Sequence, residues 1–280
     1  MEPRLILVEG LPGAGKTAVA ERMKQQLEQQ GKNVVYYEPK CTHPVDMAWQ
    51  AYLTKDEYHQ FVAECLNIWM KSKQTISDDE LIRRIELQSQ TENGHVTIAY
   101  HKINFPEKIY EKATRPLEEK EIYGGRVSFD TFRRIHLKRW NDFGQNMLIS
   151  KDIVIFESSL LQNQLFEILH SYELCDEEIL DYMMELIHTV MLLQPKIVYT
   201  MSPDIGALVD ALTIDRANAK DHKKDWYTQM ELWGRNTKYS RKYHLKGREG
   251  IIRILEERKR LDYLILHKVG IPVTWILPQD

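Results

Sequence analysis

The sequence predicts an α/β protein with three layers, α/β/α, built around a five-stranded parallel sheet. Five apolar segments of strand length alternate with segments of helical periodicity. In such a pattern each strand leads into the next through a right-handed crossover, so helices cover both faces of the sheet. The chain of 280 residues has no internal repeat or low-complexity linker. We therefore expect residues 1–280 to form a single domain, with an insertion at about residues 78–125.

A glycine-rich loop joins the first strand to the first helix. Residues 5–8 are a continuous apolar run, and the pattern G-x-x-x-x-G-K-[ST] follows with Gly10, Gly15, Lys16 and Thr17. Residues 18–30 consist mostly of strong helix formers, so the positive end of a helix dipole would face the loop. Strand, loop and helix come in the order that a Walker A phosphate loop requires.

The phosphate loop predicts ATP and Mg²⁺ as cofactors. Glycines at positions 10, 13 and 15 allow successive N–H groups to turn inward and form an anion site. Lys16 would reach the β- and γ-phosphates, and the Thr17 hydroxyl would ligate Mg²⁺. The predicted nucleotide-binding residues are Gly10, Pro12, Gly13, Ala14, Gly15, Lys16 and Thr17.

The composition is ordinary, with 43% hydrophobic residues, 28% charged residues and a net charge of −3. This balance provides no strong field for a nucleic-acid polymer or an anionic membrane, so we expect neither as a partner. Residues 1–9 lack a signal-peptide pattern, and no apolar run approaches the roughly 18 residues of a membrane span. Cys41, Cys65 and Cys175 are odd in number and widely spaced. These observations predict a cytoplasmic protein in a reducing environment.

The second strand, residues 32–37, ends just before Glu38 and Pro39. Ligands bind at the carboxyl ends of the strands in a parallel sheet. A carboxylate at this position could accept a proton or hold a substrate hydroxyl. An ordinary solvated carboxylate before a turn proline is an equally good interpretation of the position alone.

The next part of the chain predicts two helices and then the insertion. Residues 54–71 have the clearest amphipathic pattern, whose apolar face is predicted to consist of Tyr58, Phe61, Val62, Cys65, Leu66, Trp69 and Met70. Ser77 with Glu80 has the spacing of a capping box. Residues 93–94 form a turn signal, and residues 95–103 alternate as a strand does, which predicts a hairpin in the insertion. Residues 104–125 contain two prolines and a glycine pair, which predicts irregular structure. His95 and His101 lack ligand spacing, which favours surface histidines over a metal site.

The second half supplies the remaining strands. A basic amphipathic helix is expected at residues 128–149, and a third strand at residues 152–157 ends on Glu157, as a Walker B strand ends on an acidic residue. Glu157 could hold Mg²⁺ or polarise the acceptor. A helix is expected at residues 176–193.

A fourth strand is predicted at residues 196–201, followed by a helix-start signal at residues 202–204. A cluster of basic residues begins at Arg216. It could close over ATP phosphates, or it could be an ordinary exposed helix end. A helix at residues 250–268 and a strand at residues 271–276 end the pattern.

The motifs in this order resemble the thymidylate kinase and deoxynucleoside kinase branch of the P-loop kinases. The motifs that carry the resemblance are Val8-Glu9-Gly10, Glu38-Pro39, Phe156-Glu157-Ser158, residues 199–203 and the basic cluster. The resemblance implies a nucleotide kinase-like fold, a site for the acceptor hydroxyl or monophosphate beside Glu38, and a homodimer.

Two departures from that branch affect the acceptor side. Ser158 and Ser159 follow Glu157, where the branch usually has an arginine. Tyr37 precedes Glu38, where thymidylate kinases tend to carry a second arginine. A phosphate acceptor would then need substitute cations, because a buried phosphate must be paired. The candidates are Arg115, Arg126, Arg133 and Arg134.

We therefore predict an ATP-dependent small-molecule kinase that transfers the γ-phosphoryl group to a nucleoside, nucleotide or similar small acceptor. The predicted catalytic residues are Lys16, Glu38, Glu157 and Arg216, with Thr17 and Glu157 as metal ligands. A nucleotide-dependent switch or regulatory ATPase that acts on a protein partner is the alternative. Transfer from a sulfonucleotide uses similar loops, but Lys16-Thr17 and Glu157 suit Mg·ATP better.

Overall fold

The computed structural model describes residues 3–39, 43–72 and 75–277. Cys41 lies outside these residues, so its environment is not described. The chain divides into two compact units, Met1–Asp46 with Arg133–Asp280, and Met47–Phe132. The second unit contains the predicted insertion at 78–125 and extends beyond it on both sides. A single domain over the whole chain stays a prediction.

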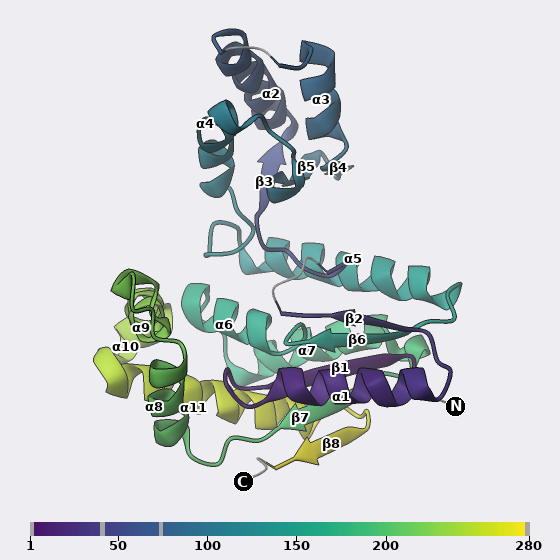
Figure 1. Ribbon diagram of the computed structural model, residues 1–280, viewed down its shortest axis with the longest axis vertical. Coiled ribbons are helices and arrows are strands. Elements are labelled where there is room, and N and C mark those ends of the chain that lie inside the picture. The colour runs from purple at the N-terminus through teal and green to yellow at the C-terminus, as the bar shows by residue number, and fades with distance from the viewer. Residues whose placement is uncertain (1–2, 40–42, 73–74, 278–280) are drawn as a thin grey trace. The chain divides into compact units, whose positions relative to one another are not determined.

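The first unit contains a parallel sheet of five strands in the order β2-β6-β1-β7-β8 (Figure 1). This confirms the predicted α/β fold class, which is P-loop kinase-like. The strands are β1 Leu5–Gly10, β2 Val34–Tyr37, β6 Ile153–Glu157, β7 Lys196–Thr200 and β8 Val273–Ile276. All five predicted strands are present, and β1, in the middle of the sheet, is completely buried.

Helices cover both faces of this sheet. Helix α1, Lys16–Gln29, packs on the face that carries Ile6 and Val8, and Figure 1 shows it running along β1. On the other face, Trp140 and Phe143 of α5 (Phe129–Leu148) contact Phe156, and α11 (Gly247–Leu266) contacts Tyr199. Alternate residues of one strand therefore point to different helices.

The remaining helices of the first unit connect these strands. They are α6 Gln162–Ser171, α7 Asp176–Thr189, α8 Ile205–Asp215, α9 Trp226–Asn236 and α10 Lys238–Tyr243, with the 3₁₀ turns η2 Met191–Leu193 and η3 His222–Lys224. Asp204 caps α8 by accepting a hydrogen bond of 2.8 Å from the Ala207 amide. Helices α6, α9 and α10 were not predicted from the sequence.

The second unit is an antiparallel sheet covered by helices. The sheet has the order β3-β5-β4, with β3 at Gln50–Thr54, β4 at Ser89–Glu92 and β5 at His95–Ala99. The helices are α2 Lys55–Met70, α3 Asp78–Glu86 and α4 Glu107–Glu118, and a 3₁₀ turn, η1, lies at Tyr100–Lys102. The predicted hairpin is present, and the predicted Ser77 cap accepts a hydrogen bond of 3.2 Å from the Glu80 amide.

Three details of the second unit differ from the prediction. Residues 104–125 are not irregular throughout, because α4 buries Ile109, Ala113 and Leu117 against the core and contains Pro116. Strand β3 was missed. The predicted apolar face of α2 buries Phe61, Cys65 and Trp69, whereas Met70 at its end is 58% exposed.

Candidate active site

The phosphate loop has the backbone that its glycines predict. Gly10, Gly13 and Gly15 have φ values of 146°, 82° and 78°. A Cβ atom on Gly10 would lie 2.4 Å from Thr200 Oγ1 and 2.6 Å from the Thr200 carbonyl oxygen. Only glycine therefore fits where β1 enters the loop beside β7.

Lys16 is buried at the start of α1 and is held by oxygen atoms. Its Nζ donates hydrogen bonds to the carbonyl oxygens of Gly10 (3.1 Å) and Leu11 (2.8 Å) and to Oε1 of Gln162 (3.1 Å). Burial lowers the pKa of Lys16 to about 8, although the nearby Glu9 carboxylate opposes this shift. Lys16 would have to exchange these partners for the oxygens of a bound phosphate.

Thr17 and Glu157, the two predicted metal ligands, are in direct contact. Thr17 Oγ1 donates to Glu157 Oε1 at 2.8 Å, and the Tyr36 hydroxyl donates to Oε2 of the same carboxylate. Glu157 faces α1 because it pairs with Val8, which points to that side of the sheet. The two oxygen ligands suit Mg²⁺, which commonly takes one or two protein oxygens together with substrate phosphates and water. The described residues contain no group of three or more His, Cys, Asp or Glu that could hold a metal by itself.

One cavity of about 790 Å³ brings the predicted catalytic residues together. Lys16, Glu38, Glu157 and Arg216 all line it. They come from the start of α1, the end of β2, the end of β6 and the C-cap of α8. The structure thus gathers at the carboxyl edge of the sheet side chains that lie up to 200 positions apart. Their individual roles stay predictions.

The charges around this cavity are mostly negative. Glu38, Glu157 and Asp215 line it, against Lys16 and Arg216. Of the arginines proposed to replace the missing cations, Arg133 donates to both carboxylate oxygens of Glu185 at 2.8 and 2.6 Å. Neither Arg133 nor Arg134, the two candidates in the same unit as the cavity, is among the described residues that line it.

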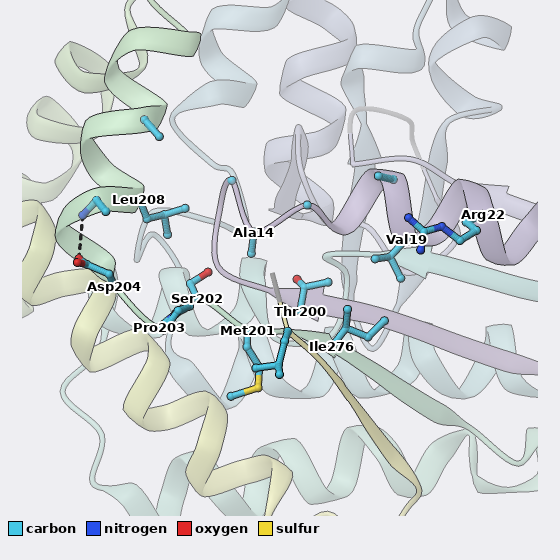
Figure 2. A pocket seen from close by; sticks show the side chains of 16 residues that line it. Ala14, Val19, Arg22, Thr200, Met201, Ser202, Pro203, Asp204, Leu208 and Ile276 are labelled. Carbon is cyan, nitrogen blue, oxygen red and sulfur yellow. Dashed lines mark hydrogen bonds between the residues drawn. The ribbon is translucent and has the colours of Figure 1, made fainter. Parts of the chain in front are cut away.

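A second pocket, of about 520 Å³, adjoins this cavity at the phosphate loop (Figure 2). Gly13, Gly15 and two residues of α8, Leu208 and Ala211, line both spaces. Most of the other lining residues are small or apolar, including Ala14, Ala18, Val19, Ala207, Ile276 and Leu277. One charged cavity and one largely apolar pocket suit a nucleoside triphosphate, whose nucleoside would lie in the second pocket and whose phosphates would lie along the loop.

A buried ionic cluster lies beneath the loop on the opposite face of the sheet. Burial raises the pKa of Glu9 to about 7, against the opposing effect of the Arg258 charge and a hydrogen bond of 2.7 Å from the Leu160 amide. Arg258 Nε donates to Asp262 at 2.8 Å, and the Tyr199 hydroxyl donates to the other oxygen of Asp262 at 2.8 Å. Glu9, Arg258 and Asp262 are completely buried. The charges of this cluster act on Lys16, and water screens them little because they are buried.

Sequence reasoning missed several residues of this site. Gln162 and Tyr36 carry no motif and are recognisable only through their contacts with Lys16 and Glu157. Ser158 has a left-handed backbone, with φ of 64°, and its amide donates to the Val8 carbonyl at 2.9 Å. Such a conformation is uncommon for a non-glycine residue. The one sequence feature that could have indicated the buried ionic cluster is Glu9, a carboxylate at the end of a strongly apolar run.

Comparison with protein-family models relates the first part of the chain to a known family. A model of the family described as "Zeta toxin" matches residues 1–86, from β1 through the phosphate loop to the end of α3. The chain is therefore similar to zeta toxins over its first third. A search of curated proteins found no match.

The fold, the loop and this similarity agree on a P-loop kinase, an enzyme that uses ATP. They do not support the thymidylate kinase and deoxynucleoside kinase branch that the sequence motifs resembled. Within the described part of the chain, no helix is long and apolar enough to cross a bilayer.

Proposed function

We propose that this protein transfers the γ-phosphoryl group of ATP to a hydroxyl group of a small molecule. The observation that carries the proposal is the shared cavity, in which Glu38 lies with Lys16, Thr17, Glu157 and Arg216. A carboxylate opposite a phosphate loop is placed as a general base would be.

The charges of the cavity favour a hydroxyl acceptor over a phosphate acceptor. A phosphate entering beside Glu38 and Asp215 would meet their negative charges, while Lys16 and Arg216 are already required for the donor and Glu157 for Mg²⁺. A neutral hydroxyl meets no such repulsion. It also needs a base, which Glu38 can provide.

Each residue that lines the cavity would have a separate role in phosphoryl transfer. The oxygen of the acceptor hydroxyl forms a bond to the γ-phosphorus while the bond between that phosphorus and ADP breaks. Glu38 accepts the proton that the hydroxyl loses. Lys16 and Arg216 neutralise charge on the transferring group, and the loop amides hold the phosphates. Thr17 and Glu157 would hold Mg²⁺, which supplies further charge neutralisation.

The similarity to zeta toxins supports one class of acceptor. Zeta toxins phosphorylate the sugar nucleotide UDP-N-acetylglucosamine. A sugar hydroxyl has the chemistry that the Glu38 side of the cavity favours. We therefore place sugar nucleotides first among acceptors, ahead of nucleosides and nucleoside monophosphates.

An acceptor screen with ATP and Mg²⁺ tests the proposal. Sugar nucleotides, nucleosides, nucleoside monophosphates, free sugars and aminoglycoside-like alcohols are incubated with the protein, and mass spectrometry detects a product heavier by one phosphate. Lys16→Ala is the blank. A product that forms on a hydroxyl and disappears in the variant supports the proposal. ATP turnover without any phosphorylated acceptor contradicts it and favours a nucleotide-dependent switch.

A further inference from the structure

The side chain of Gln162 carries a hydrogen-bond donor that the folded protein does not use. Gln162 is the first residue of α6, is half-buried, and lines the cavity of about 790 Å³ together with Lys16 and Glu38. Its Oε1 accepts a hydrogen bond of 3.1 Å from Lys16 Nζ. Its Nε2 has no hydrogen-bond partner among the described residues.

The contact with Lys16 determines the orientation of the Gln162 amide. An ammonium group only donates hydrogen bonds, so the amide atom that faces it must be the oxygen. The NH₂ group is therefore the end of the amide that does not face Nζ, and both of its N–H donors are unused. Nε2 is not one of the buried polar atoms that lack a partner, so solvent reaches it. A ligand in the cavity can reach it as well.

Phosphate binding should displace the Gln162 oxygen from Lys16. The ammonium group has three N–H donors, and the oxygens of Gly10, Leu11 and Gln162 accept one hydrogen bond each. A phosphate oxygen can bind Lys16 only by replacing one of them. The two carbonyl groups belong to the loop backbone, whereas Oε1 ends a flexible side chain, so we expect Oε1 to give way. The phosphate oxygen then lies beside the Gln162 amide, within reach of its NH₂ group.

The position of Gln162 points to the γ-phosphoryl group rather than to the nucleoside. Gln162 lines the cavity that contains Glu38, the proposed base, and does not line the pocket that suits the nucleoside. Acidic side chains outnumber basic ones in this cavity, so the transferring group needs donors besides Lys16 and Arg216. An amide supplies two N–H donors without a charge of its own.

We infer that Gln162 binds the γ-phosphoryl group of ATP through its side-chain NH₂ group, once a phosphate oxygen has replaced its Oε1 on Lys16. This inference rests on the proposed function and adds one residue to those that contact the transferring group. The hydrogen bond would stabilise negative charge on the phosphoryl oxygens.

Binding of two nucleotides tests the inference. AMP-PNP, a non-hydrolysable analogue of ATP, carries the γ-phosphoryl group, whereas ADP lacks it. Isothermal titration calorimetry measures both dissociation constants, and the quantity compared is the ADP value divided by the AMP-PNP value. Gln162→Leu should lower this ratio by about tenfold, the loss of one hydrogen bond to a charged group. The ratio is compared because the loss of a partner for Lys16 affects both nucleotides.

A second variant and a matched control accompany Gln162→Leu. Gln162→Glu keeps the shape of the side chain and an oxygen for Lys16, so it should fold, but it replaces the NH₂ group by an oxygen and should lower the ratio at least as much. Asn163→Leu removes the next amide of α6, which is also half-buried but does not line the cavity. It should keep the wild-type ratio. Thermal unfolding checks that each variant is folded.

The possible outcomes distinguish this inference from the proposed function. A lower ratio in both Gln162 variants and an unchanged ratio in Asn163→Leu would support the inference. If the Gln162 variants change the affinities for ADP and AMP-PNP equally, or raise the ratio, Gln162 acts only through Lys16 and the inference is overturned. The proposed function would still stand in that case. If the wild-type protein binds neither nucleotide, the proposed function fails as well.

Discussion

Thr17 Oγ1 donates a hydrogen bond of 2.8 Å to Glu157 Oε1, which joins the first turn of α1 to the carboxyl end of β6. The contact places a hydroxyl and a carboxylate side by side at the edge of the cavity, where both can reach one cation. We expect Glu157→Gln to raise the Mg²⁺ concentration needed for half-maximal ATP turnover by about 10- to 100-fold, because the amide lacks the negative charge. Initial rates over a series of Mg²⁺ concentrations measure this.

Tyr36→Phe is the control for this prediction. It removes the hydroxyl that donates to Glu157 and leaves the carboxylate charge in place. Its effect on the Mg²⁺ requirement should be clearly smaller than that of Glu157→Gln. An unchanged Mg²⁺ requirement in Glu157→Gln would show that Glu157 has no part in metal binding.

Substitution of Glu38 should affect phosphoryl transfer but not nucleotide binding. It lines the cavity from the end of β2 and lies outside the phosphate loop. With an acceptor identified, Glu38→Ala should lower kcat by about 10²- to 10⁴-fold, the usual contribution of a general base. AMP-PNP affinity should stay at the wild-type value. Glu38→Asp, which keeps a shortened carboxylate, should retain part of the activity, and full activity in Glu38→Ala would rule out the base.

The charge of Lys16 should make nucleotide binding depend on pH. Burial lowers the pKa of this lysine to about 8, whereas a lysine in water titrates near 10.5. The charged form binds phosphate, so AMP-PNP affinity should fall as the pH rises from 7 through 8, by at most about tenfold per pH unit. Lys16→Arg should bind more weakly but without this decline, because a guanidinium stays charged. A wild-type affinity that is constant up to pH 9.5 would contradict the prediction.

The sheet could be predicted because its signals are local. Each strand is an apolar run next to a helical segment, and the phosphate-loop motif fixed the first strand and helix. Helix α4 was missed because Pro116 and the glycines at 124 and 125 suggested irregular structure. Pro116 lies in the last turn of the helix, and burial of Ile109, Ala113 and Leu117 outweighs the hydrogen bond that the proline removes.

The site could be predicted only where a residue follows a strand or belongs to a motif. Glu38 and Glu157 were found because the carboxyl ends of parallel strands meet at one edge. Gln162 and Arg258 were not found. Nothing near them in the sequence indicates that Gln162 bonds to Lys16 or that Arg258 acts on Glu9. Contacts between residues 146 and about 250 positions apart depend on the packing of the whole unit.

Glu9 should make the stability of the protein depend on pH in a defined direction. Its pKa rises from 4.5 to about 7 in the folded protein because burial disfavours the charged carboxylate. A raised pKa means that the folded state holds this proton more tightly than the unfolded state. The resulting stabilisation is complete below pH 4.5 and is lost as the pH rises through 7.

Glu9→Gln keeps the neutral form of this side chain at every pH and can still accept the Leu160 hydrogen bond. At pH 8 it should therefore be more stable than the wild type, with a gain in the free energy of unfolding on the order of 3 kcal/mol. At pH 4.5 the two proteins should melt at nearly the same temperature. Glu21→Gln, an exposed change on α1, is the control and should show no such pH-dependent gain. A difference between Glu9→Gln and the wild type that does not vary with pH would contradict the prediction, because it would mean that the pKa of Glu9 is the same in the folded and unfolded states.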